Sequence, residues 1–176
     1  VAATTWTLDN FGDTLVACSD ADGVAYQWDG DVSDGAEIIT NGGFDTNSDW
    51  TLGAGWQIRT VPGPFANLAY VASTVTTHTH LEQSGLSLVA GQMYRVKFKV
   101  AGMAAGNTMS VEVGHSFGGA GEVKFLDIDV FNNFPNTLPL QEFTFSATET
   151  NTNCSIRFKS NQTGGNDYWV DNVSLK

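Results

Sequence analysis

The regular spacing of apolar residues along this sequence is the feature that most limits how the chain can fold. No window of about 11 residues or more carries apolar side chains at the i, i+3, i+4, i+7 spacing of an amphipathic helix. Apolar and polar residues alternate instead, in short segments bounded by glycine, asparagine and proline. The clearest case is segment 93–101, in which Tyr94, Val96, Phe98 and Val100 alternate with Arg95, Lys97 and Lys99.

The same alternation recurs along the whole chain, in segments 23–29, 55–60, 67–73, 79–83, 109–114, 122–131, 142–147, 155–160 and 167–175. About ten short strands joined by turns predict an all-β protein built as a sandwich or a barrel. In a sandwich of two antiparallel sheets, one face of each strand packs against the facing sheet. We therefore expect five aromatic side chains to be buried between the sheets: Tyr94, Phe98, Phe143, Phe145 and Phe158.

An acidic, glycine-containing run at residues 29–35 divides the chain. Such a run cannot bury apolar surface, so it predicts a linker or an exposed turn. It separates an N-terminal segment, 1–36, from a main domain, 37–176. The N-terminal segment has strand patterns near residues 6–8, 13–18 and 24–28, too few to fold alone. We expect a short β-hairpin appendage that packs on the main domain, on a partner or on upstream sequence; strand exchange into a homo-oligomer is one such arrangement. The chain starts with Val1, mid-pattern, as a fragment of a larger polypeptide would.

The charge balance of the chain limits the kinds of molecule that it can bind. With 8 Lys+Arg against 19 Asp+Glu the formal net charge is −11, and no cluster of cations is present. Nucleic acid and anionic membranes are therefore poor partners. The two cysteines, Cys18 and Cys154, could pair, but the sequence has no disulfide framework, which favours two buried reduced thiols.

Three blocks of sequence carry a resemblance to a known family. They are Glu37-Ile-Ile-Thr-Asn41-Gly42-Gly43-Phe44-Asp45, Leu86-Ser-Leu88-Val-Ala-Gly91-Gln-Met-Tyr94-Arg-Val96 and Asp167-Tyr-Trp169-Val-Asp171-Asn172-Val173. In this order and spacing, residues 37–176 resemble the family-4/9 carbohydrate-binding modules. The resemblance implies a jelly-roll β-sandwich of two antiparallel sheets that is not catalytic.

The N-terminal segment has a resemblance of its own. Trp6-Thr-Leu8-Asp-Asn10-Phe11-Gly12, followed by Tyr26-Gln-Trp28-Asp29, is similar to a stretch of large structural proteins of tailed phages. This resemblance implies a virion protein as the source of the chain.

A structural calcium ion is implied by the carbohydrate-binding-module resemblance. It ties the opening loop of such modules to the last strand, and Ca²⁺ takes six to eight oxygen ligands. The matching positions are Asn41, Gly43 (through its carbonyl), Asp45 and Asp171. In the alternative interpretation, Asn41 and Asp45 only cap a turn and Asp171 accepts hydrogen bonds from backbone amides.

Sugar binding requires an aromatic face and polar groups that bond hydroxyls. Alternate positions of segment 122–131 would form such a face if the aliphatic residues between them face the core. These positions are Phe125, Asp127, Asp129 and Phe131. Phe134 lies in the loop that follows. Further candidates are Trp56, Trp169, Tyr70, His115, Phe117 and Gln141, and core packing is the favoured alternative for any single aromatic residue.

Catalytic patterns are weak. His78, His80 and Glu82 share a strand face that could ligate zinc, but stray histidines are common on threonine-rich edges, which favours the absence of a metal site. Asp127 and Asp129 are neighbours on one strand, whereas glycosidase carboxyls lie across the scissile bond. We therefore expect a carbohydrate-binding module of an extracellular or virion protein, with a polysaccharide or cell-surface glycan as partner. The alternative is a virion structural, decoration or host-attachment domain that binds no sugar.

Overall fold

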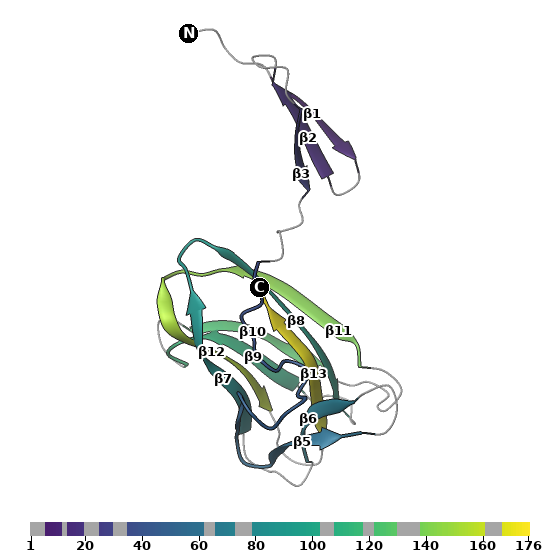
Figure 1. The fold of residues 1–176 in the computed structure, drawn as a ribbon, viewed down its shortest axis with the longest axis vertical. Helices are drawn as coiled ribbons and strands as arrows, with labels where there is room; N and C mark the ends of the chain where they lie inside the picture. Colours follow the sequence, from purple (N-terminus) through teal and green to yellow (C-terminus); the bar gives the residue numbers. More distant parts are fainter. Residues whose placement is uncertain are drawn as a thin grey trace. The chain divides into compact units, whose positions relative to one another are not determined.

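The computed structural model describes residues 6–11, 14–19, 25–29, 35–61, 66–72, 79–102, 108–117, 122–129, 138–160 and 167–176. The chain forms two compact units, Val1–Gly35 and Ala36–Lys176. The first unit contains a three-stranded antiparallel sheet in the order β1-β2-β3, with β1 Trp6–Phe11, β2 Thr14–Ser19 and β3 Ala25–Asp29 (Figure 1). It is thus a three-stranded meander, one strand more than a hairpin.

The second unit consists of two antiparallel five-stranded sheets (Figure 1). The first has the order β10-β9-β12-β7-β4, with β4 Thr51–Leu52, β7 Thr79–Leu88, β9 Thr108–Gly114, β10 Glu122–Asp129 and β12 Asn151–Ser160. The second has the order β11-β8-β13-β6-β5, with β5 Trp56–Thr60, β6 Asn67–Val71, β8 Met93–Gly102, β11 Leu140–Ser146 and β13 Tyr168–Leu175. The predicted all-β jelly-roll sandwich is confirmed.

One core lies between the two sheets. Phe98 of β8 and Phe158 of β12 are both 0% exposed and meet edge to face across the sandwich, with ring centroids 5.1 Å apart. Tyr94 and Phe145 are also buried, so these four expectations are confirmed. Phe143 is only half-buried, because β11 is an edge strand that pairs with β8 alone.

The first residues of the second unit are hydrogen-bonded to its last strand, β13. Ile38 N donates to Leu175 O at 2.8 Å, and Val173 N donates to Gly42 O at 2.9 Å. The Glu37 carboxylate accepts from Leu175 N at 2.8 Å and from the Ser174 hydroxyl at 2.6 Å. A Cβ at Gly42 would lie 1.9 Å from Val173 O, so this close approach of two backbones requires glycine.

The expectation of two buried thiols holds for one cysteine only. Cys154 is buried and free, whereas Cys18 is exposed. Cys18 lies on β2, the central strand of the three-stranded sheet. None of the described segments forms a helix that is long and apolar enough to cross a membrane.

Candidate functional site

The first sheet carries a set of polar side chains on the side away from the core. The alternation of β7, β9 and β12 buries Leu81, Val111 and Phe158 and sends their neighbours to the opposite side. We call this set the polar face; it consists of His80, Glu82, Ser110, Glu112, Arg157 and Lys159.

Strand register arranges the polar face in two rows across the sheet. Arg157 lies opposite Glu82 on one side and opposite Glu112 on the other. In the next row, Lys159 lies opposite His80 and Ser110. Opposite charges at directly facing positions stabilise a sheet, so the row with Arg157 between two glutamates holds its side chains in place.

Arg157 is held from two sides. Its Nε forms an ion pair with Oε2 of Glu112, whose side chain is only 3% exposed. The Phe117 ring lies over the guanidinium, 3.7 Å from its carbon to the ring centroid. A cation in van der Waals contact with an aromatic face gains about 0.5–2 kcal/mol. Glu112, Arg157 and Phe117 therefore form a fixed stack over the middle of the sheet.

His80 and Glu82 form a looser pair at the edge of the same face. Their Nε2 and Oε2 atoms are 3.4 Å apart, and the side chains are 42% and 21% exposed. The face considered for zinc also included His78, which lies outside the described residues. Among the residues that the structure describes, no group of three His, Cys, Asp or Glu side chains could hold a metal ion.

Strand β10 carries three of the residues expected to bind a sugar, and its register with β9 is irregular. Phe125 pairs with Val111, a core residue, while Asp127 pairs with Ser110 of the polar face and Asp129 with Thr108. A register shift between Phe125 and Asp127 separates them. One extra residue in a strand reverses which side its later positions take. The expected face of Phe125, Asp127 and Asp129 therefore contains a register shift, and its role in sugar binding stays a prediction. The other two aromatic candidates of this region, Phe131 and Phe134, lie outside the described residues.

Two tryptophan candidates lie inside the molecule. Trp56 and Trp169 are each 5% exposed. Trp169 packs against Tyr70 with ring centroids 5.7 Å apart, and Tyr70 in turn lies under the Arg59 guanidinium at 4.2 Å. Rings with so little exposed surface offer no platform to a sugar, which agrees with the alternative of core packing.

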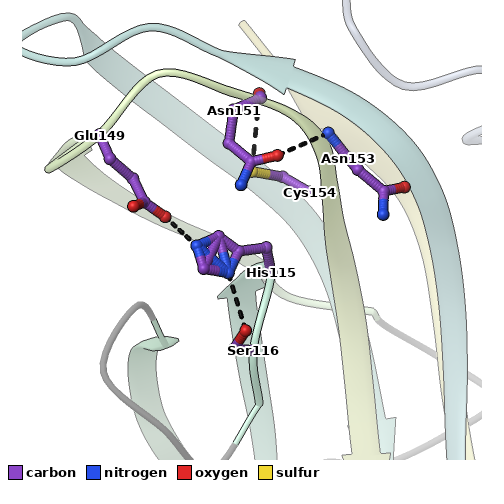
Figure 2. A network of polar contacts seen from close by, with 6 residues as sticks. All are labelled: His115, Ser116, Glu149, Asn151, Asn153 and Cys154. Carbon is purple, nitrogen blue, oxygen red and sulfur yellow. Dashed lines mark hydrogen bonds and ion pairs between the residues drawn. The ribbon is translucent and has the colours of Figure 1, made fainter.

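His115 lies at the end of β9 in a small polar network (Figure 2). Its Nε2 forms an ion pair with Glu149 of the β11–β12 turn, and its Nδ1 lies 2.9 Å from the Ser116 hydroxyl. The adjoining pocket is lined by Leu88, Phe145 and Cys154 and measures about 10 Å³, room for one water molecule. Burial raises the pKa of the Cys154 thiol, and the Glu149 carboxylate raises it further. The network ties two loops together and is too small for a sugar ring.

A second polar site lies on the other sheet. Asp45, Lys99, Asp171 and Asn172 line a surface pocket of about 260 Å³, together with Gly43, Ala66 and Asn67. Burial raises the pKa of Asp171, the Asn172 backbone N–H and the Lys99 ammonium oppose the rise, and the Asp45 carboxylate adds to it. Asp171 Oδ1 accepts a hydrogen bond from Asn172 N at 2.7 Å.

The residues of this pocket fit a calcium ion poorly. Asn41 is not among the lining residues: its amide donates to Thr46 O at 2.8 Å and Ser48 O at 2.9 Å, as a turn cap does. The other three predicted positions, Gly43, Asp45 and Asp171, do line the pocket, and an ammonium group shares it with the two carboxylates. Calcium requires six to eight oxygens without a competing cation. The calcium site therefore stays a prediction.

Glu112 and Arg157 were missed by sequence reasoning. The signal was present, because a charged residue stands at a polar position of each of the alternating segments 109–114 and 155–160. What the sequence did not show is that these two segments are neighbours in one sheet.

Several solved structures with a similar fold are carbohydrate-binding modules. A family 4 module matches with 18% identity and a TM-score of 0.56, over 76% of this chain and 97% of its own. A family 22 module with the catalytic module of a Clostridium thermocellum xylanase, complexed with xylohexaose, matches with 16% identity and a TM-score of 0.60, over 80% of this chain and 28% of its own. Modules of families 16 and 61 match as well.

One match comes from a phage. The enzymatically active domain of a bacteriophage CBA120 tailspike protein matches with 13% identity and a TM-score of 0.54, over 79% of this chain and 21% of its own. No family model and no curated protein matches the sequence. These likenesses show that the second unit has the fold of the carbohydrate-binding modules.

Proposed function

We propose that residues 36–176 are a non-catalytic carbohydrate-binding module of a larger extracellular or virion protein. The ligand is a polysaccharide or a cell-surface glycan, and it binds on the polar face. The stack of Phe117 on Arg157 carries this proposal, because it combines an aromatic ring with fixed, planar hydrogen-bonding groups.

The chemistry of the polar face suits a sugar. A pyranose ring presents apolar C–H groups, which pack on an aromatic face, and hydroxyls, which bond to carboxylates and guanidinium groups. The half-buried Phe117 ring offers an aromatic surface for the C–H groups. Hydrogen bonds to the hydroxyls can come from three half-buried side chains, Glu82, Arg157 and Lys159. Because Arg157 is already paired with Glu112, its remaining N–H groups are oriented before a ligand arrives, which lowers the entropy cost of binding.

Affinity electrophoresis through gels containing xylan, β-1,4-galactan or mixed-linkage β-glucan tests the proposal. We expect at least one polysaccharide to retard the chain, and Phe117→Ala to weaken that binding about tenfold, since one stacked ring contributes on the order of 1 kcal/mol. Leu140→Ala is the matched control, because Leu140 is a large apolar residue, 57% exposed, on the opposite sheet. Equal losses in both variants would contradict binding at the polar face.

A virion structural or host-attachment domain without sugar binding is the second candidate. It is supported by the tailspike match and by the resemblance of residues 6–29 to phage structural proteins. Failure of the chain to bind any glycan of a broad array, with a folded control, would favour this candidate.

A further inference from the structure

Lys99 lies directly across from Asp171 in the second sheet. The two residues face each other in the register of β8 and β13, on the side away from the core. Lys99 is half-buried and Asp171 is 6% exposed. Both line the pocket that also contains Asp45, so an ammonium group stands beside two carboxylates.

Asn172 connects the cation to the buried carboxylate. With its amide oriented as its neighbours require, the side-chain oxygen accepts from Lys99 Nζ at 3.0 Å. The amide nitrogen then donates to Asp171 Oδ1 at 3.3 Å. Asn172 has a φ of 51°, in the left-handed region that asparagine tolerates better than most residues. The backbone at this position therefore allows an asparagine that joins Lys99 to Asp171.

The junction next to the pocket is already closed by protein groups. The bonds from Ile38 to Leu175 and from Val173 to Gly42 hold the opening segment on the last strand. The Glu37 carboxylate adds bonds to Ser174 and Leu175. A metal ion that bridged the opening loop and β13 would duplicate contacts that the chain makes by itself.

We propose that Lys99 is the resident cation of the Asp45–Asp171 pocket, and that this chain holds its opening segment on its last strand without a divalent metal. The ammonium supplies positive charge to two carboxylates that would otherwise repel each other, and it does so from within the sheet. A divalent ion would have to enter against that fixed charge. This pocket is on the opposite sheet from the polar face, so the inference is independent of sugar binding.

The first test is the metal response of the unaltered 176-residue chain. We expect protein purified without chelator to contain no stoichiometric calcium by elemental analysis. We also expect its thermal midpoint to be the same in EDTA and in millimolar CaCl₂, since only a ligand that binds the folded state raises the midpoint. Stoichiometric calcium, or a midpoint that rises with CaCl₂ and falls with EDTA, would overturn the proposal.

The second test asks whether Lys99 and Asp171 act together. Lys99→Met should lower the thermal midpoint by several degrees, and clearly less when Asp171→Asn is already present, because the amide no longer needs a cation. Lys97→Met is the control: Lys97 is on the same strand and face but pairs with the exposed Glu142 at 3.6 Å. If Lys99→Met costs no more than Lys97→Met, or if its cost is the same with and without Asp171→Asn, Lys99 is not the resident cation.

Discussion

Glu112 and Arg157, which are 45 residues apart in the sequence, face each other on β9 and β12 and form an ion pair beneath the Phe117 ring. The carboxylate is 3% exposed and the guanidinium side chain 19%. Both charges have lost most of their hydration, so each depends on the other. The pair is therefore a joint determinant of stability and of the geometry of the polar face.

Removal of one partner should be costly. We expect Glu112→Ala to lower the free energy of unfolding by about 3 kcal/mol, because it leaves Arg157 largely desolvated and without a counter-ion. The double variant Glu112→Ala/Arg157→Ala should lose less than the sum of the two single variants. Urea denaturation of the four proteins measures both values. Glu142→Ala, which removes a carboxylate that is 40% exposed, should cost less than about 1 kcal/mol; a similar cost at both glutamates would contradict the argument.

Alkaline pH should destabilise the fold through Tyr168. Its side chain is 0% exposed, and burial raises its pKa to about 12 from the usual value of 10.0. Between these two values the unfolded chain releases the phenolic proton while the folded chain keeps it, so stability falls as pH rises from about 10 to about 12, by roughly 2–3 kcal/mol. Urea melts across this range measure the slope. Tyr168→Phe should make the slope shallower, and an unchanged slope would contradict the assignment to Tyr168.

Gly42 and Gly43 should respond differently to the same substitution. A Cβ at Gly42 would lie 1.9 Å from Val173 O, whereas at Gly43 the nearest atom is Asp45 Oδ2 at 3.9 Å. Gly42→Ala must displace a backbone and should cost at least about 2 kcal/mol. Gly43→Ala, the control, should change stability by less than about 1 kcal/mol. Thermal melting compares the two, and equal effects would show that Gly42 is not sterically required.

The two thiols should differ in reactivity. Burial raises the pKa of Cys154, and its sulfur is enclosed, whereas Cys18 is exposed. Because the thiolate is the reactive form, Ellman's reagent at pH 8 should titrate one thiol per native chain and two in guanidinium chloride. Cys18→Ser should leave the native chain without rapid reaction. Fast labelling of that variant would mean that Cys154 is reached in the folded state.

The alternation of single segments was enough to predict the sandwich, because a period of two assigns each side chain to a face without any knowledge of the partner strand. Phe98 and Phe158 were placed in the core in this way. The rule assumes an unbroken period, and the register shift between Phe125 and Asp127 leaves no mark in the sequence.

Other features depend on which strands are neighbours. Phe143 follows the buried pattern and is only half-buried, since β11 lies at an edge. The order of strands in the sheets determines which residues pair across strands. It places Lys99 opposite Asp171 and Glu112 opposite Arg157. Local patterning predicts the face of a residue, and topology decides its partner.

The direct bonds between the opening segment and β13 have a mechanical consequence. Residues 38 and 42 bond to residues 175 and 173, so the two segments run antiparallel and the chain enters and leaves the second unit side by side. A pulling force applied between residues 36 and 176 would load the hydrogen bonds nearest these ends, those of Glu37, Ile38 and Lys176, before the Val173–Gly42 bond. The junction would therefore open one hydrogen bond at a time from its outer end, which takes less force than shearing all of its bonds at once.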